Sequence, residues 1–322
     1  MKYFEKVIEP IKNELNEFNN NLENYLHSNS KSINNITNYI LKHKGKQLRP
    51  ILVFLSAKLL GEVNKSTYIG AALLEFIHTA TLIHDDVVDD AHIRRNNFSI
   101  NSLWRNKAAV LYGDYLLAKS LLLCVKNSCF HFLEIISEVV KDMSEGELIQ
   151  LDKIKKNDIS YDTYYNIISK KTASLFSACT YIGAITNTNK PEILSDFKQL
   201  GYNLGMAFQI KDDLNDLIPF NETDKPKFND IKENYYTLPI LYVLNNNNYY
   251  EKLKIKKLLI DFLKNKKSQQ DIYSYLKEKN AIEFTKKTIK FYIEKCKLIL
   301  KNYPESSEKQ SFYLILDYIS DF

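Results

Sequence analysis

Apolar side chains recur every three or four residues along almost the whole of this 322-residue chain. Phe4, Val7, Ile8 and Ile11 show this spacing at the start of the chain, and it predicts amphipathic helices. Helix-breaking residues are few, with 8 Gly and 7 Pro, so long helices joined by short loops are expected. The sequence contains neither strand-like alternation nor an internal repeat. It therefore predicts a single all-α domain over residues 1–322.

The helical pattern is interrupted in only a few places. The segments expected to be helical are residues 1–43, 51–60, 67–90, 108–125, 131–150, 161–184, 191–217 and most of 237–322. A polar connection is expected before the helix that starts at 108, and residues 218–228 have the composition of a loop. No strand is expected.

The net charge of +5 is modest and comes from 44 basic and 39 acidic residues. Much of the lysine lies in residues 251–267, which we interpret as a solvated helix face. Contact with an acidic membrane or a nucleic acid is the alternative. Since no nucleic-acid-binding motif accompanies this run, no nucleic-acid partner is expected.

Cysteine spacing and hydropathy bear on the cellular compartment. The four cysteines form no CxxC motif and have no His at zinc spacing, so buried thiols in a reducing compartment are expected. The N-terminus is amphipathic rather than a signal peptide, and no run of about 18 apolar residues occurs. A soluble, cytoplasmic protein is therefore predicted.

The segment LIHDDVVDD, residues 82–90, places four aspartates beside apolar residues on one predicted helix. Asp85 and Asp89 are four residues apart and project from the same helical face, whereas Asp86 is offset by about 100°. Carboxylates next to an apolar face cost free energy unless a counter-charge is present. A divalent cation such as Mg²⁺, which prefers oxygen ligands, would remove that cost.

The same DDxxD pattern recurs on a second apolar helix, at Asp212, Asp213 and Asp216. A single motif of this kind could be an ordinary acidic helix face. Two of them on separate apolar helices are difficult to explain as solvated faces. They predict two acidic walls that face each other across a cavity and hold metal ions between them.

Basic residues accompany both motifs, and Lys and Arg are the usual ligands of phosphate. They are Lys46, Arg49, Arg94, Arg95, Lys170, Lys171 and Lys225. Each alone would be interpreted as a surface charge. Carboxylates, metal ions and flanking cations together indicate a site for diphosphates.

Five segments, taken together, resemble the trans-isoprenyl diphosphate synthase family and look closest to bacterial long-chain polyprenyl diphosphate synthases. They are GKQLRP, LIHDDVVDDAHIRR, GDYLLAKS, SKKTASLFSA and GMAFQIKDDLND, in the expected order between about residues 40 and 240. The resemblance implies an all-α isoprenoid synthase fold, in which helices surround a deep central cavity, and a homodimer. It also implies Mg²⁺-dependent condensation of isopentenyl diphosphate onto an allylic diphosphate, with two to three Mg²⁺ per site. A product so apolar would be released at a membrane surface.

The resemblance also implies roles for individual residues. The metal ligands would be Asp85, Asp89 and Asp212, supported by Asp86, Asp213 and Asp216. The allylic diphosphate would contact Arg94, Lys171 and Lys225, and isopentenyl diphosphate would contact Lys46, Arg49, His78 and Arg95. Thr172 and Gln209 would place oxygens near the developing carbocation. For His78 and Gln209, a satisfied polar group in the core is the alternative.

Three positions depart from the family pattern after the second acidic motif. Asp224 and Phe228 stand where glycines are usual, and Tyr235 stands where a lysine is expected. Because a phenol cannot supply that cation, one phosphate contact is lost unless Lys227 or Lys232 replaces it. Slower turnover or a stiffer closing loop is expected.

In this family, side chains just before the first DDxxD limit the length of the product. Ala80 and Thr81 are small, and Ile77 continues the same side of the helix. They predict an unobstructed channel and a product of about C30–C45, used for a quinone side chain. The alternatives are a shorter-chain geranylgeranyl or farnesyl diphosphate synthase, a terpene cyclase, and a non-catalytic subunit of a heteromeric synthase. Two intact acidic motifs argue against the last two.

Overall fold

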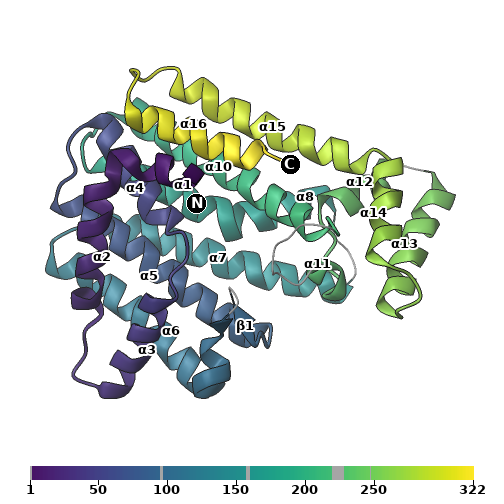
Figure 1. The fold of residues 1–322 in the computed structure, drawn as a ribbon, viewed down its shortest axis with the longest axis horizontal. Coiled ribbons are helices and arrows are strands. Elements are labelled where there is room, and N and C mark those ends of the chain that lie inside the picture. Colours follow the sequence, from purple (N-terminus) through teal and green to yellow (C-terminus); the bar gives the residue numbers. More distant parts are fainter. Residues whose placement is uncertain (1, 95–96, 157–159, 220–227, 247) are drawn as a thin grey trace. The chain divides into compact units, whose positions relative to one another are not determined.

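The computed structural model describes residues 2–94, 97–156, 160–219, 228–246 and 248–322. The chain divides into two compact units, each built from separate stretches of sequence. Unit 1 consists of Met1–Val140, Leu175–Gly201 and Asn302–Leu314, and unit 2 of Lys141–Ser174, Tyr202–Lys301 and Ile315–Phe322. Both are helical, as predicted (Figure 1).

Unit 1 is built around the long helix α5. Its elements are α1 (Lys2–Ile8), the 3₁₀ turn η1 (Glu9–Ile11), α2 (Lys12–Leu26), α3 (Lys31–Lys42), α4 (Leu48–Leu60), α5 (Lys65–Val88), β1 (Ile93–Arg94), β2 (Asn97–Phe98), α6 (Ile100–Lys126) and α9 (Ser174–Ile185). Asn64 starts α5 with a capping box, in which its side chain accepts from the backbone of Ser66 and Thr67. Helix α5 packs against α4 and α6 (Figure 1). Most of its residues are therefore buried in the core of this unit.

The connection between α5 and α6 differs from the sequence prediction. A two-residue antiparallel hairpin forms there, with Ile93 opposite Phe98 and Arg94 opposite Asn97. The expectation of no strand was therefore wrong. Helix α6 also begins at Ile100, earlier than predicted, and its first turn ends in a kink at Arg105 (φ 69°).

Unit 2 contains α8 (Tyr161–Ile168), the π-helical turn η2 (Ser169–Ala173), α11 (Asn229–Lys232), α12 (Leu238–Asn246), α13 (Tyr249–Leu263), α14 (Gln269–Glu278) and α15 (Ala281–Leu300). Helix α12 packs against α13, α14 and α15 (Figure 1). Besides α9, whose first residue Ser174 belongs to unit 2, three helices contribute residues to both units: α7 (Phe130–Lys156), α10 (Pro191–Asp216) and α16 (Ser307–Ser320). The predicted helix over 161–184 is in fact α8, η2 and α9 in succession.

Two further sequence predictions bear on the environment of the protein. All four cysteines are buried and free, as expected. By length and composition α5 and α6 could each cross a membrane, although no membrane-spanning run was predicted from the sequence. The apolar window of α5 is 67% buried inside unit 1, which is typical of the core helix of a soluble protein, whereas that of α6 is only 33% buried. A cytoplasmic location stays a prediction.

Candidate active site

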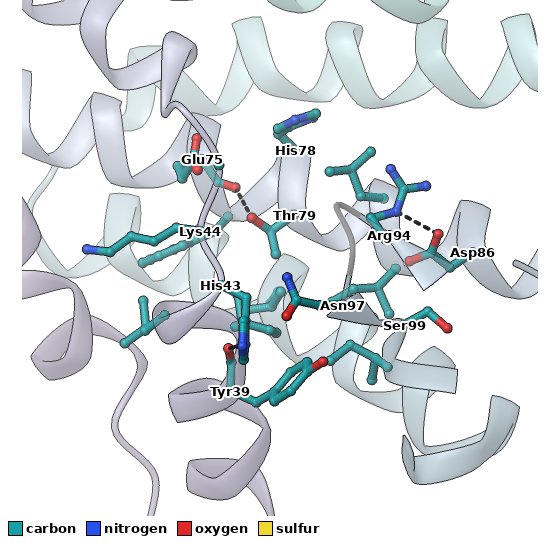
Figure 2. A pocket seen from close by; sticks show the side chains of 18 of the residues that line it. Tyr39, His43, Lys44, Glu75, His78, Thr79, Asp86, Arg94, Asn97 and Ser99 are labelled. Atoms are coloured by element: carbon teal, nitrogen blue, oxygen red, sulfur yellow. Dashed lines mark hydrogen bonds and ion pairs between the residues drawn. The ribbon is translucent and has the colours of Figure 1, made fainter. Parts of the chain in front are cut away.

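The first acidic motif lies at the C-terminal end of α5, and its aspartates differ in exposure. Asp85 is half-buried and Asp89 is exposed, whereas Asp86 is only 2% exposed. The Arg94 guanidinium donates through Nε to Oδ1 of Asp86 at 2.6 Å, because the hairpin folds β1 back against the helix (Figure 2). Asn101 donates to the backbone oxygen of Asp86 at 3.2 Å. Asp86 therefore anchors the hairpin, while Asp85 and Asp89 reach toward solvent.

A pocket opens beside this motif, between α3, α5 and the hairpin (Figure 2). Its polar lining includes His43, Lys44, Glu75, His78 and Thr79, and its apolar lining comes from α2, α5 and α6. Of these five residues, only His78 was predicted from the sequence to belong to the site. Burial lowers the pKa of Lys44, although Glu75 opposes the shift.

The basic loop that begins α4 is held in place by α2. Asn19 accepts hydrogen bonds from Lys44 at 2.5 Å and from Gln47 at 3.0 Å, and Gln47 has a left-handed backbone (φ 53°). Lys46, between them, is exposed. Arg49 lies over the ring of Phe176, with 5.0 Å between the guanidinium carbon and the ring centroid. The loop thus presents Lys46 at the surface and turns Arg49 inward.

The second acidic motif lies at the end of α10 in unit 2, and Asp213 is its buried member. Asp212 is exposed, whereas Asp213 is 5% exposed. The phenol of Tyr164 donates to Oδ2 of Asp213 at 2.6 Å, and Gln209 donates to Oδ1 at 2.7 Å. Thr172 donates in turn to Gln209 at 2.6 Å. This chain of hydrogen bonds connects α8, η2 and α10.

Burial raises the pKa of Asp213 to about 7. The hydrogen bonds from Tyr164 and Gln209 lower it, and the charges of Asp212 and Asp216 raise it. The hydrogen bonds from Tyr164 and Gln209 therefore stabilise the ionised form of Asp213 against the effect of burial. Tyr164, which is fully buried, was not selected from the sequence, since nothing distinguishes it there from the other 21 tyrosines.

Asp216 holds the start of α11. Its carboxylate accepts from the backbone nitrogens of Asn229 at 3.3 Å and Asp230 at 3.4 Å, and its carbonyl accepts from Phe228 at 3.0 Å. Phe228 is fully buried and has φ 60°, a left-handed backbone that favours glycine. The non-glycine residue noted in the sequence therefore adopts the conformation that a glycine would take more easily.

The two lysines of η2 are each paired with side chains of α7. Lys170 contacts Asp142 at 2.9 Å and Glu145 at 2.8 Å. Lys171 forms an ion pair with Glu147 and donates to Gln150 at 2.9 Å. These four partners on α7 were missed, although their spacing forms two i,i+3 pairs, Asp142 with Glu145 and Glu147 with Gln150.

A glycine allows this close approach of α7 to η2. A Cβ atom at Gly146 would lie 2.8 Å from Cγ of Lys171 and 3.0 Å from Cβ of Lys170. Any larger residue would push η2 away from α7. Gly146 is therefore part of what positions Lys171.

Tyr235 stands close to the second motif. It is 6% exposed, and the charges of Asp213 and Asp230 are among the causes that raise its pKa, after burial itself. Within the part of the chain that the structure describes, its phenol oxygen has no hydrogen-bond partner. The hydroxyl of Thr237, also buried, has none there either.

Two predicted site residues, Arg95 and Lys225, lie outside the described residues, as do Asp224 and Lys227. The two acidic motifs belong to different units, Asp85–Asp89 to unit 1 and Asp212–Asp216 to unit 2. The prediction that they form facing walls of one cavity therefore stays a prediction.

The carboxylates of both motifs suit a hard divalent cation such as Mg²⁺. Asp85, Asp89 and Asp212 reach the surface, while Asp86 and Asp213 are engaged by protein donors. Among the described residues, no three His, Cys, Asp or Glu side chains are grouped so that they could hold a metal by themselves. A bound ion would therefore need oxygens from diphosphate and water, which is usual for Mg²⁺.

Comparison with known proteins decides the family. The sequence model described as Polyprenyl synthetase matches residues 30–278. This chain belongs to the polyprenyl synthetase family. Octaprenyl diphosphate synthase of Escherichia coli is 35% identical over 75% of this chain and 75% of its own length. Heptaprenyl diphosphate synthase component 2 of Bacillus subtilis is 32% identical over 87% of this chain and 80% of its own.

Shorter-chain enzymes are also related to this polyprenyl synthetase. Geranylgeranyl diphosphate synthase of Saccharolobus solfataricus is 30% identical over 84% of this chain and 80% of its own length. The chain is therefore a prenyltransferase that makes a medium- or long-chain trans-prenyl diphosphate, as the sequence predicted at the level of the family.

Solved structures confirm the all-α isoprenoid synthase fold of this polyprenyl synthetase. Decaprenyl diphosphate synthase from Rhodobacter capsulatus has a TM-score of 0.89 at 28% identity, covering 99% of this chain and 98% of that one. Polyprenyl synthase from Caulobacter crescentus CB15, solved with calcium and isoprenyl diphosphate, gives 0.89 at 27% identity with the same coverage. Polyprenyl synthases use a divalent metal, in agreement with the oxygen-rich motifs here.

The residues expected to set product length in this polyprenyl synthetase lie on α5. Ala80 and Ile77 are buried, at 0% and 1% exposure, and Thr81 is half-buried with its hydroxyl bonded to the carbonyl of His78. Farther down, a Cβ at Gly70 would lie 2.4 Å from Cγ2 of Ile182 and 3.5 Å from the ring of Phe132. Phe132 is therefore a bulky side chain beside α5 that the sequence did not identify, and the product channel stays a prediction.

Proposed function

We propose that this protein is a long-chain all-trans polyprenyl diphosphate synthase. It extends geranyl, farnesyl or geranylgeranyl diphosphate with isopentenyl diphosphate to about C30–C45, and the product becomes a quinone side chain. The observation that carries the proposal is the pair of DDxxD motifs. In each, one aspartate is buried and hydrogen-bonded, and others reach the surface.

The aspartates of the two motifs would have two roles, binding metal and orienting the metal ligands. Asp85, Asp89, Asp212 and Asp216 hold two to three Mg²⁺, which when bound supply Lewis acidity and a template for the diphosphate leaving group. Asp86 and Asp213 are buried and accept hydrogen bonds from Arg94, Tyr164 and Gln209, so they would orient and support the metal ligands beside them.

Cationic side chains would bind the two substrates. Lys46, Arg49, His78 and Arg95 hold isopentenyl diphosphate, and Arg94, Lys171 and Lys225 hold the allylic diphosphate. To bind the allylic diphosphate, Lys171 must leave its ion pair with Glu147 and contact phosphate instead. Until then, Glu147 would hold the Lys171 ammonium in position.

Thr172 and Gln209 would stabilise positive charge that develops on the allylic substrate. Each has a side-chain oxygen fixed by the hydrogen-bond chain that ends at Asp213. Oxygens that are already oriented stabilise a developing charge without reorganising during the reaction.

Product length would depend on the side of α5 below the first motif. Ala80, Thr81 and Ile77 leave room for the growing tail, and Phe132 closes the channel near Gly70. At 1.5 Å per residue, Gly70 lies about 22 Å along the helix from Asp85. This depth supports a long product.

We also propose that the protein is a homodimer that associates through α6. Exposed apolar residues follow one face of this helix beyond its kink: Val110, Leu111, Leu121, Leu122 and Val125, each 40–60% exposed. An apolar stripe of this length on a soluble protein indicates an interface. Light scattering should give a dimer for the wild type and a monomer for Leu111→Lys/Leu122→Lys.

The decisive experiment incubates the purified chain with isopentenyl diphosphate, Mg²⁺ and each allylic primer in turn, and sizes the products by mass spectrometry. The expected product is C30–C45, and Asp89→Ala should abolish it. A product of C20 or less would instead support the shorter-chain alternative. Absence of any elongation would instead favour a subunit of a heteromeric enzyme, since the Bacillus subtilis relative is named as component 2 of its synthase.

A further inference from the structure

Helix α13 in unit 2 carries an exposed apolar stripe. Tyr249, Leu253, Ile260 and Leu263 are 70%, 47%, 50% and 42% exposed. At 100° per residue their positions fall within about 80° of one another around the helix axis. Ile255 and Leu259 are buried and lie next to the stripe, on the side of the helix beyond Leu263. The stripe is therefore additional to the face that α13 needs for folding.

Lysines border this stripe on both sides. Lys252, which is half-buried, lies on one edge, and the exposed Lys257 and Lys264 lie on the other. Lys256, also exposed, falls within the stripe. Further exposed lysines, Lys266 and Lys267, follow directly after the helix. In α13, which is described throughout, no exposed position is acidic, since Glu251 and Asp261 are only half-exposed. Glu251 is also paired with Lys279.

We propose that this face of α13 docks on the surface of an anionic lipid bilayer. A helix that lies in the membrane interface combines apolar side chains that enter the headgroup region with lysines that contact anionic lipids. Tyrosine is favoured at that depth, because its ring is apolar and its hydroxyl stays hydrated. Tyr249, the apolar stripe and its lysine borders have this arrangement.

The same composition argues against a protein partner. Interfaces between proteins are depleted of lysine at their centre, whereas Lys256 lies within the stripe on α13. The stripe on α6 is the contrasting case, because none of the exposed positions between Val110 and Val125 is a lysine. We therefore assign α6 to self-association and α13 to lipid.

The benefit of lipid contact rests on the proposed function, because a polyprenyl product is insoluble in water and must leave the enzyme into a bilayer. Each CH₂ group exposed to water costs about 0.8 kcal/mol. The docking itself is independent of catalysis, so a binding assay tests it even if the proposed product is wrong.

The test is co-sedimentation of the full chain with vesicles of phosphatidylcholine alone or with about one third phosphatidylglycerol, at low and high salt. Binding is expected only to the anionic vesicles and should weaken as salt rises. Lys256→Glu/Lys257→Glu should reduce partitioning about 30-fold or more, at about fivefold for each lysine removed from the surface. Ile260→Ser/Leu263→Ser should reduce it at least about tenfold.

The matched control is Lys287→Glu/Lys290→Glu, which makes the same charge change at exposed positions of α15. It should retain most of the binding. Equal losses in both charge variants would mean a nonspecific effect of net charge and would overturn the assignment to α13. So would failure of the wild type to sediment at low salt, or a change of oligomeric state in the α13 variants.

Discussion

Replacing Tyr164 by Phe tests whether the buried hydrogen-bond chain supports the ionised form of Asp213. Burial raises the pKa of Asp213 from 3.8 to about 7, so the folded chain binds more protons than the unfolded chain between these values. Stability therefore falls as pH rises through that window. The hydrogen bond from Tyr164 favours the ionised carboxylate and limits this fall. Without it, the pKa should rise further and the fall should extend to higher pH.

The free energy of unfolding lost in Tyr164→Phe depends on whether the acceptor, Asp213, is charged. At pH 5.5 Asp213 is mostly protonated, and a hydrogen bond between neutral groups contributes about 1 kcal/mol to the free energy of unfolding. At pH 8.5 the carboxylate is mostly ionised, and a hydrogen bond to a charged group contributes about 2–3 kcal/mol. Tyr164→Phe should therefore cost about 1–2 kcal/mol more at the higher pH.

The measurement is urea unfolding of wild type and variant at both pH values, with EDTA present so that no metal ion binds the motif. Tyr165→Phe is the matched control, since it removes the neighbouring phenol, whose hydrogen bond goes to Thr288, a group that does not titrate. Its cost should be the same at both pH values. A cost of Tyr164→Phe that does not increase with pH would refute the reasoning.

The other predictions concern positioning and product length. Lys171→Ala should lower kcat/KM about 30-fold or more, the value of a charged hydrogen bond to phosphate, while Lys170→Ala should change it less than about threefold. Gly146→Ala places a Cβ 2.8 Å from Cγ of Lys171 and should lower the free energy of unfolding by about 1–3 kcal/mol, measured in urea. Phe132→Ala should lengthen the products and Ala80→Tyr should shorten them, by mass spectrometry; unchanged lengths would contradict the channel assignment.

Much of the helical framework could be predicted because apolar periodicity reports directly on a buried face. The predicted 51–60 and 67–90 correspond to α4 and α5 within a few residues. The hairpin was missed because strands of two residues are too short to show an alternating pattern. The kink at Arg105 was missed for a different reason, since a left-handed arginine has no local sequence signal.

At the site, residue types could be predicted but their pairing could not. The 100° offset of Asp86 correctly separated it from Asp85, yet its contact with Arg94 depends on how the hairpin folds back. Tyr164 reaches Asp213 across 49 residues of sequence. Such contacts arise from tertiary packing, which no local pattern contains.

The π-helical turn η2 limits which changes in length the chain can tolerate between Ser169 and Ser174. Its closing hydrogen bond runs from the nitrogen of Ser174 to the carbonyl of Ser169, so the turn holds one residue more than an α-helical turn. Deleting that residue would restore a regular helix and rotate everything beyond it by about 100°. Lys171 would then turn away from α7, or Thr172 away from Gln209, although every functional side chain would still be present. The number of residues in this turn is therefore constrained more tightly than their identity.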